Sequence, residues 1–410
     1  MHGHRVGLPV AVAIAVVAAG AATVAFRPRS GVIDSAPASA QAYFSPSELE
    51  RSRDYSGPQR ALGLGGLAVT GGALALIALR PPRRVRRALE RAGARPLLGA
   101  AGAGAGLSIA LVVVSLPLGA VRHSRAEEFG LSTQDWGSWA ADVAKAAGIE
   151  ALLAGAGAAL LIGLMRRFPR NWWLPASGAV VAISAAFVWL SPIVIEPIFN
   201  KFTPLAQGDL RREVLDLADR SGVEVGEVYR IDASRRTTGA NAYVGGLGHT
   251  KRVVLYDNLI EGFSPAEVRS VVAHELGHVK HDDVPKGLLW IAIVAPAGLF
   301  LIQRLTERLA PDAERAGPST LPAAVFSLAL VSFVLGLAGN AVSRGVEARA
   351  DAYALRLTDD PAGFIALERR LVTQNLGDPD PPGLLVALFG THPPAMERIG
   401  FALTYAREKR

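Results

Sequence analysis

The stretch Val271-Val-Ala-His-Glu-Leu-Gly-His278 lies among helix-forming, mostly apolar residues. Its two histidines, His274 and His278, are four residues apart, so on a helix they share one face and both imidazoles can reach one metal ion. Neutral imidazoles suit zinc, and the carboxylate of Glu275, beside the first histidine, can take a proton from water held by such an ion. The spacing therefore predicts a zinc site on a buried helix.

Two hydrogen-bonded core histidines are the alternative interpretation of this pattern, because short motifs recur by chance. The chain has only 8 His in 410 residues, so a histidine pair at this spacing around a glutamate is hard to reach by accident. The same arrangement is typical of zinc peptidases. A site of this kind still needs a third protein ligand, which must come from elsewhere in the chain.

Glu347 is the candidate for that third ligand. It follows an apolar segment, and Asp351 stands four residues later on the same helix face. Glu347 can bind zinc there, while Asp351 accepts a hydrogen bond from the outer ring nitrogen of a ligand histidine and fixes its tautomer. Taken alone, the segment also fits a solvated helix whose acids pair with nearby arginines: Arg344, Arg349 and Arg356. Only its combination with the histidine pair favours the metal site.

Composition predicts an integral membrane protein. Hydrophobic residues make up 50% of the chain, charged residues make up 19%, and the mean hydropathy is +0.28. A helix needs about 20 apolar residues to cross the hydrocarbon core. Seven segments qualify and are expected to be helical: 6–26, 61–79, 97–121, 147–165, 173–195, 287–305 and 320–340. A signal peptide is the alternative for the first segment, but its long apolar run and the lack of a plain cleavage site favour an anchor.

The metal-binding motifs fall in the two polar regions of the chain. We expect four parts. Residues 1–199 form a membrane region with five spans, and 200–286 form a catalytic segment with the histidine pair. Residues 287–340 form two further spans, and 341–410 form a C-terminal catalytic segment with Glu347. The polar regions must fold together if their residues share one ion. The expected fold is a mostly α membrane protein of about seven transmembrane helices with a small α+β catalytic domain.

Strands and helices alternate in the first polar region. β-branched residues predict strands at 223–231 and 252–256. Helices are expected over 210–220 and 265–280, the second with Ser264 as N-cap and Pro265 as its first residue.

Arginine dominates the net charge of +7. A dense group precedes the third span: Arg80, Arg83, Arg84, Arg86, Arg87, Arg91 and Arg95. Arginines beside spans are more often topology determinants that face anionic lipid than nucleic-acid contacts, so no nucleic-acid partner is expected. The chain has no cysteine, which excludes disulfides and leaves histidine and carboxylate to hold the metal.

Further motifs resemble a known family. They are Phe44 to Tyr55, Glu127-Glu-Phe-Gly-Leu-Ser-Thr-Gln134, Pro192 to Leu205, Ser343-Arg344 with Glu347 and Ala350-Asp351, and Thr391-His-Pro-Pro-Ala-Met-Glu-Arg398. In this order they resemble the type 1 CAAX prenyl proteases, integral-membrane zinc metallopeptidases whose bacterial relatives include the heat-shock membrane protease. The likeness extends over nearly the whole chain. The short stretch from Leu259 to His274 lacks the long acidic insertion of some eukaryotic members, so the chain resembles a compact bacterial-type member.

The resemblance implies a zincin-like (gluzincin) catalytic domain with one Zn²⁺ per chain. The implied zinc ligands are His274, His278 and Glu347, and the implied general base is Glu275. His392 would approach the zinc site and stabilise the tetrahedral oxyanion or share in proton transfer, with Asp351 and Arg398 as supports.

Asn241-Ala-Tyr-Val-Gly245 resembles the family's substrate-binding edge strand, with Asn241 and Ala242 beside the substrate. An exposed strand edge offers unpaired backbone groups to an extended peptide. A hairpin is the alternative, since Gly245, Gly246 and Gly248 suit a tight turn, and both can hold at once.

The implied function is a membrane-embedded zinc metalloendopeptidase. Its expected partners are membrane lipids and a peptide or protein substrate, which the resemblance allows to be membrane-associated or lipidated. A quality-control protease of the heat-shock type and a catalytically silent zinc-binding scaffold remain alternatives, although Glu275 argues against the scaffold because a structural zinc needs no base. A transporter is disfavoured because ionisable residues are scarce within the spans.

Two criteria predict opposite sides of the membrane for the catalytic domain. The family resemblance places it in the cytoplasm. The positive-inside rule instead keeps the arginine-rich loops at 80–95 and 166–170 in the cytoplasm, which with seven spans puts the zinc site outside.

Overall fold

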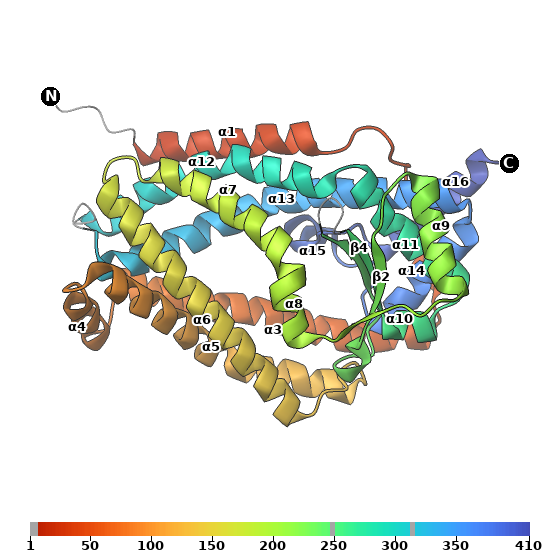
Figure 1. The fold of residues 1–410 in the computed structure, drawn as a ribbon, viewed down its shortest axis with the longest axis horizontal. Coiled ribbons are helices and arrows are strands. Elements are labelled where there is room, and N and C mark those ends of the chain that lie inside the picture. Colours follow the sequence, from red (N-terminus) through yellow and green to blue (C-terminus); the bar gives the residue numbers. More distant parts are fainter. Residues whose placement is uncertain (1–6, 247–250, 312–315) are drawn as a thin grey trace.

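The computed structural model describes residues 7–246, 251–311 and 316–410. Within these ranges, seven helices are long and apolar enough to cross a membrane, as the sequence predicts (Figure 1). They are α1 (Leu8–Phe26), α3 (Pro46–Leu79), α5 (Pro96–Glu128), α6 (Trp136–Arg167), α7 (Trp173–Leu190), α12 (Asp283–Leu309) and α13 (Leu321–Thr358). A π-helical turn, Ser191–Ile195, and a short helix α8, Glu196–Phe199, extend α7.

Several of these helices run well beyond the predicted spans. α3 begins at Pro46 rather than near residue 61, because Ser45 caps it and Glu48 completes a capping box. α13 continues far past residue 340, so Glu347 and Asp351 stand on the same 38-residue helix as the seventh span. Hydropathy detects only the part of a helix that lies in hydrocarbon, which explains why the sequence underestimates these lengths.

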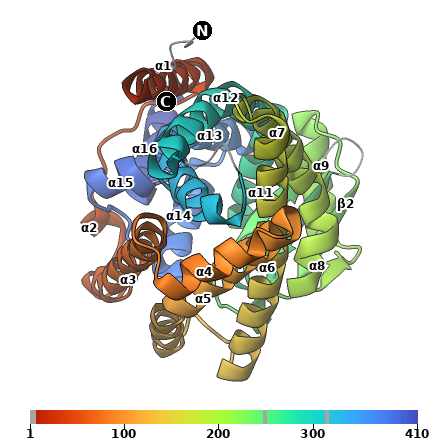
Figure 2. The same cartoon turned by 90° about the vertical axis from the view of Figure 1, so that its left-hand side faces the viewer.

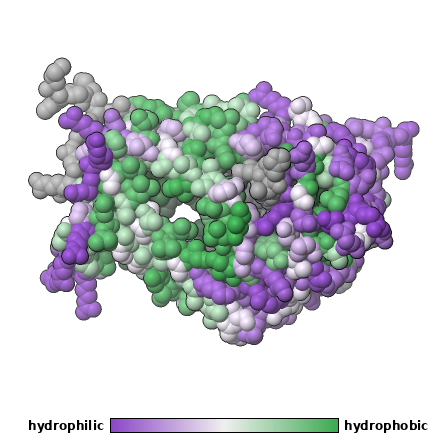
Figure 3. All heavy atoms as spheres, viewed as in Figure 1, coloured by the Kyte–Doolittle hydropathy of each residue, from purple (hydrophilic) through white to green (hydrophobic). Residues whose placement is uncertain are grey.

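The surface divides into an apolar middle and two polar ends. Figure 3 shows a hydrophobic band over the long helices, hollowed near its centre, with hydrophilic residues at both ends. The arginine-rich helix α4 (Arg83–Ala92) lies at the end away from the sheet, which Figure 2 views directly. The loop at 166–170 lies at that end too, so both arginine-rich loops are separated from the small domain by the length of the bundle.

A small mixed sheet and short helices form the opposite end. Its strands are β1 (Phe202–Pro204), β2 (Glu227–Ile231), β3 (Ala242–Gly245) and β4 (Arg252–Tyr256), in the order β1-β2-β4-β3. β2 and β4 are parallel, while β1 and β3 flank them antiparallel. The helices here are α9 (Asp209–Ser221), α10 (Asp257–Gly262), α11 (Pro265–Lys280), α14 (Pro361–Asn375), α15 (Gly383–Phe389) and α16 (Ala395–Glu408). One further short helix, α2 (Ala40–Tyr43), lies between α1 and α3.

The predicted strand at 223–231 starts too early, and β2 begins only at Glu227. The preceding residues close α9 instead: Gly222 adopts a left-handed conformation with φ of 66°, and the Val223 amide donates to the carbonyl of Ala218. This is the usual end of a helix at glycine. The other elements predicted for the first polar region, including Ser264 as N-cap of α11, agree with the structure to within a residue.

One hydrophobic core joins the sheet to its helices. Val228, Val253 and Leu255 of the parallel strands are fully buried against α9 and α11. Leu367 of α14 belongs to the same core, so segments on both sides of the last two spans pack together. This packing fixes α11 against the sheet.

Close approach of α5 and α6 within the membrane depends on Gly104. A Cβ at this position would lie 2.6 Å from the carbonyl oxygen of Ala154 and 2.6 Å from the Cβ of Ala158. Small residues let helix backbones approach in the bilayer, where packing drives association.

We expect Gly104→Ala to destabilise the protein in detergent by about 1–3 kcal/mol through overpacking. The matched control is Gly106→Ala on the same helix, where an added Cβ meets no atom within 4 Å. Thermal unfolding of both variants checks this. Equal melting temperatures for the two would show that the α5–α6 contact tolerates the extra methyl group.

Candidate metal centre

The helix α11 begins with a strong N-terminal signal. The Ser264 side chain accepts from the amide of Glu267, the Glu267 carboxylate accepts from the amide of Ser264, and Pro265 occupies the first turn. Val272 and Leu276 are fully buried on its core side. This anchoring leaves the histidines on the side of α11 that faces α13.

α11 and α13 pack closely, and Gly277 is the reason they can. A Cβ on Gly277 would lie 3.3 Å from the Cα of Ala350 and 3.3 Å from the ring of Tyr353. A larger residue would push the two helices apart. The glycine between the metal motif's glutamate and its second histidine therefore allows Glu347 to reach the imidazoles.

Three donor atoms from these two helices meet at one point. The Nε2 atoms of His274 and His278 are 3.1 Å apart, and Glu347 oxygens lie 3.1 Å from the first and 3.6 Å from the second. Ligands about 2.0–2.1 Å from a tetrahedral zinc ion are about 3.3 Å from one another. The His, His and carboxylate donor set therefore fits zinc in both chemistry and spacing, and all three residues can hold one ion.

The outer nitrogen of each histidine faces a carboxylate. His274 Nδ1 lies 2.7 Å from Asp351 Oδ1, and His278 Nδ1 lies 3.0 Å from Asp283 Oδ2. Nδ1 of each ring donates to its carboxylate, which leaves the Nε2 lone pair directed at the shared point. Both carboxylates thus orient the rings for metal binding.

Two arginines hold these carboxylates in turn. Arg398 of α16 binds Asp351 through Nε at 2.8 Å and reaches Glu368 of α14 at 2.9 Å, while Arg349 of α13 binds Asp283. Asp351 is fully buried, so a carboxylate without such partners would be costly there. The predicted alternative of a solvated acidic helix does not fit, because Glu347 and Asp351 are buried and pair with histidines rather than with neighbouring arginines on their own helix.

The surroundings of His274 favour positive charge. Burial lowers the pKa of this ring, but the carboxylates of Asp351 and Glu347 outweigh burial and raise the pKa to about 10. A proton and a metal ion compete for the same nitrogen. The electrostatic environment that attracts the proton therefore also attracts a cation.

Glu275 turns from α11 toward the edge strand β3. Its carboxylate accepts a hydrogen bond from the amide of Val244, and burial raises its pKa above the ordinary value. β3 lies at the edge of the sheet, paired only with β4 within the described sheet. The carboxylate is thus held between the histidine pair and an exposed strand edge.

The predicted substrate-binding residues lie at the start of β3. Asn241 is exposed and its side-chain oxygen accepts from the amide of Ala242, which is buried. β3 pairs antiparallel with β4 and lies at the edge of the sheet, as both interpretations require, and substrate binding along it stays a prediction. Gly248 of the predicted turn lies outside the described residues.

His392 approaches the metal group from the loop between α15 and α16. Its Nε2 lies 3.3 Å from a Glu347 oxygen, its Nδ1 lies 2.9 Å from the Thr391 hydroxyl, and its side chain is 57% exposed. The imidazole therefore borders the three donors from the open side.

Sequence reasoning missed Asp283, Arg349 and Glu368 as members of this network. Asp283 follows His278 by five residues, beyond the end of α11, and only the left-handed conformation of Asp282 turns the chain so that its carboxylate reaches the ring. Arg349 appeared in the sequence only as a possible partner for Glu347 and Asp351. No local pattern marks Glu368.

Two protein-family profiles match almost the whole chain. Peptidase family M48 matches residues 204–406, and the N-terminal domain of CAAX prenyl proteases, with five membrane helices, matches residues 32–201. The first match contains all the metal-binding candidates. The second covers the membrane region before the sheet except for α1.

Curated relatives and a solved structure agree with these profiles. An uncharacterized metalloprotease, YhfN, of Bacillus subtilis is 29% identical over 88% of this chain and 86% of its own length. CAAX prenyl protease 1 of Saccharomyces cerevisiae is 30% identical over 74% of this chain and 72% of its own length. The crystal structure of Ste24p from S. mikatae has the same fold, with a TM-score of 0.76, 20% identity, and coverage of 98% of this chain and all of that one.

The fold and the site define the class of protein: an integral, multi-pass membrane zinc metallopeptidase, which hydrolyses peptide bonds. The chain belongs to the CAAX prenyl protease 1 family of M48 peptidases. The predictions of family, enzyme class, zinc dependence and membrane location are confirmed.

The role of Asp283 in orienting His278, which the sequence did not reveal, can be tested by mutation. We expect Asp283→Asn to weaken zinc binding about 10–100-fold, because loss of the carboxylate removes the charge that orients His278. Zinc affinity is measured by competition with a chelator in detergent. Asp282→Asn is the matched control, since this exposed neighbour makes no side-chain contact with the histidines. An Asp283 variant that holds zinc like the control would show that Asp283 does not tune the site.

Proposed function

We propose that the protein is a zinc metalloendopeptidase in which His274, His278 and Glu347 bind the metal and Glu275 is the general base. The observation that carries the proposal is the convergence of the three donor atoms within 4.8 Å of one another on α11 and α13, next to a glutamate held at the edge of β3. We further propose that segments 200–286 and 341–410 form one catalytic domain.

Zinc, when bound, supplies a Lewis acid that polarises the scissile carbonyl and lowers the pKa of water to about 7. The Glu275 carboxylate accepts the proton of the attacking water and returns it to the leaving amine nitrogen. The raised pKa of Glu275 suits it to take up and release a proton. Transfer by one positioned carboxylate avoids any covalent enzyme intermediate.

His392 is proposed to stabilise the oxygen that becomes negative as the carbonyl is attacked. His392 lies beside the three proposed metal ligands but is not one of them. Its partly exposed ring can donate a hydrogen bond from Nε2. Arg398 and Asp351 support the site by holding His274 in its orientation.

The substrate is proposed to bind as an extended peptide along β3. The edge of β3 offers backbone groups for pairing, and Asn241 with Ala242 marks its start. A substrate strand added to this edge passes beside Glu275. The Glu275 carboxylate is held there by the amide of Val244 in β3. Because the metal group stands where α13 leaves the membrane bundle, a peptide of a membrane-associated or lipidated protein is the proposed substrate.

We expect Glu275→Gln to lower kcat on a cleaved peptide by at least about 10²–10⁴-fold while zinc stays near one per chain, because the amide cannot take the proton. Cleavage of internally quenched peptides by detergent-purified protein is measured together with zinc content. His278→Ala is the contrasting variant and should lose both zinc and activity. Loss of zinc in Glu275→Gln would contradict the role of Glu275 as base, and retention of full activity would end the proposal.

We expect His392→Ala to lower kcat about 10²–10³-fold with little change in zinc content, because alanine has no donor for the developing oxyanion. Steady-state kinetics on the same peptides separate kcat from KM. If the variant loses zinc instead, His392 is a metal ligand; if only KM rises, it binds substrate without acting in the chemical step.

A further inference from the structure

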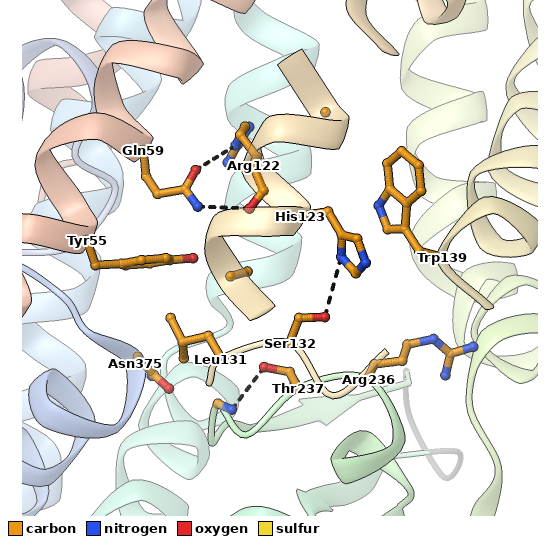
Figure 4. A pocket seen from close by; sticks show the side chains of 13 residues that line it. Tyr55, Gln59, Arg122, His123, Leu131, Ser132, Trp139, Arg236, Thr237 and Asn375 are labelled. Carbon is orange, nitrogen blue, oxygen red and sulfur yellow. Dashed lines mark hydrogen bonds between the residues drawn. The ribbon is translucent and has the colours of Figure 1, made fainter. Parts of the chain in front are cut away.

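A cavity of about 560 Å³ lies between the membrane helices and the small domain (Figure 4). Tyr55 and Gln59 of α3, Arg122 and His123 of α5, Trp139 of α6, and Arg236 from the loop before β3 line it. In Figure 4 hydrogen bonds join Gln59 of α3 to Arg122 of α5, and the small domain lies beneath. A cavity of this size accommodates a small organic ligand or a headgroup.

The wall of this cavity carries positive charge. Its lining includes Arg122 and Arg236 but no carboxylate residue. Arg236 is paired with Asp142 at 2.7 Å, whereas Arg122 makes side-chain contact only with the neutral amide of Gln59, at 3.2 Å, among the residues the structure describes. The Arg122 guanidinium thus keeps donors free for an anion.

His123 lies in the same wall and has a ring nitrogen that makes no hydrogen bond in the described structure. It is 6% exposed, stacks on Trp139 with ring centroids 5.1 Å apart, and contacts the edge of Trp136. Its Nδ1 lies 3.4 Å from the Ser132 hydroxyl, so the ring proton sits on Nε2 when that hydroxyl donates. Nε2 is buried and has no hydrogen-bond partner in the described structure, although Glu127 comes within 3.7 Å. Buried polar groups without partners are uncommon and call for a ligand or water.

The cavity stands at the level where the apolar runs of the helices end. The run 97–121 of α5 stops directly before Arg122, and the run 61–79 of α3 starts directly after Arg60, one residue past Gln59. Trp136 and Trp139 are at the start of α6, and tryptophan and tyrosine concentrate at membrane interfaces. The phosphate of a lipid headgroup occupies this depth, so an anion there can arrive from the bilayer itself.

We propose that this cavity binds the phosphate headgroup of an anionic phospholipid. Arg122 donates to the phosphate oxygens, His123 supplies a second donor, and Tyr55 and Trp139 flank the headgroup at the interface. The site is separate from the metal group and holds whether or not the proposed catalytic roles do. Thr237 and Gly239, on its lower wall, lead directly into β3, so the lipid contacts both the membrane helices and the catalytic segment.

The test uses the full chain, stripped of lipid in detergent and titrated with phosphatidylglycerol or phosphatidylcholine. Native mass spectrometry gives the affinity of the first lipid bound, and hydrogen exchange of the segment 122–139 reports whether binding is local. We expect phosphatidylglycerol to bind more tightly and to protect this segment, and Arg122→Gln to weaken its binding about tenfold, the effect of one charge-assisted hydrogen bond.

Arg84→Gln in α4 is the matched control, an exposed arginine at the other end of the bundle, and should leave both signals unchanged. His123→Gln is the second variant and should also weaken binding if it unfolds at the wild-type temperature. Equal affinity of Arg122→Gln and wild type, or no protection of the segment, would overturn the proposal. If inorganic phosphate protects the segment as strongly as phosphatidylglycerol does, the proposal of a lipid ligand is overturned and the cavity is a site for free phosphate.

Discussion

The contact between His274 and Asp351 is the constraint on which the rest of the site depends. It joins α11, which belongs to the small domain, to α13, which belongs to the membrane bundle, through a buried pair 2.7 Å apart. A buried carboxylate is tolerated only with full compensation, and here His274 and Arg398 supply it. The Arg398 guanidinium extends the network to Glu368, so four helices, α11, α13, α14 and α16, share one set of charges.

This constraint explains why the seventh span does not end at the membrane surface. A single 38-residue helix carries the apolar span and then Glu347 and Asp351. A loop between span and ligand would add conformational freedom where the donor atoms need positions fixed to within a few tenths of an ångström. The position of the metal group relative to the membrane span is therefore set by the continuity of α13.

The sheet contributes to the site mainly through its edge strand, β3. β3 is short and lies at the edge of the sheet, and its Val244 amide holds Glu275. One strand thus positions the proposed base and offers the surface along which the proposed substrate lies. The cavity proposed to bind a lipid headgroup begins just before β3, so this short segment stands between the two proposed sites.

The sequence by itself determined the family, the seven spans, α11 with its cap, β4, and the candidates His274, His278, Glu275, Glu347 and Asp351. Each rests on local information: hydropathy over a span, a four-residue spacing on a helix, or a capping pattern. Only the tertiary structure decided that Asp283, Arg349 and Glu368 join the network, and that His123 is buried beside a basic cavity with a ring nitrogen that makes no hydrogen bond in the described structure. These depend on contacts between residues far apart in the chain, or on a single turn such as that at Asp282, and no periodicity encodes them. Helix lengths beyond the bilayer were underestimated for a related reason, since hydropathy reports the hydrocarbon and not the packing that continues a helix outside it.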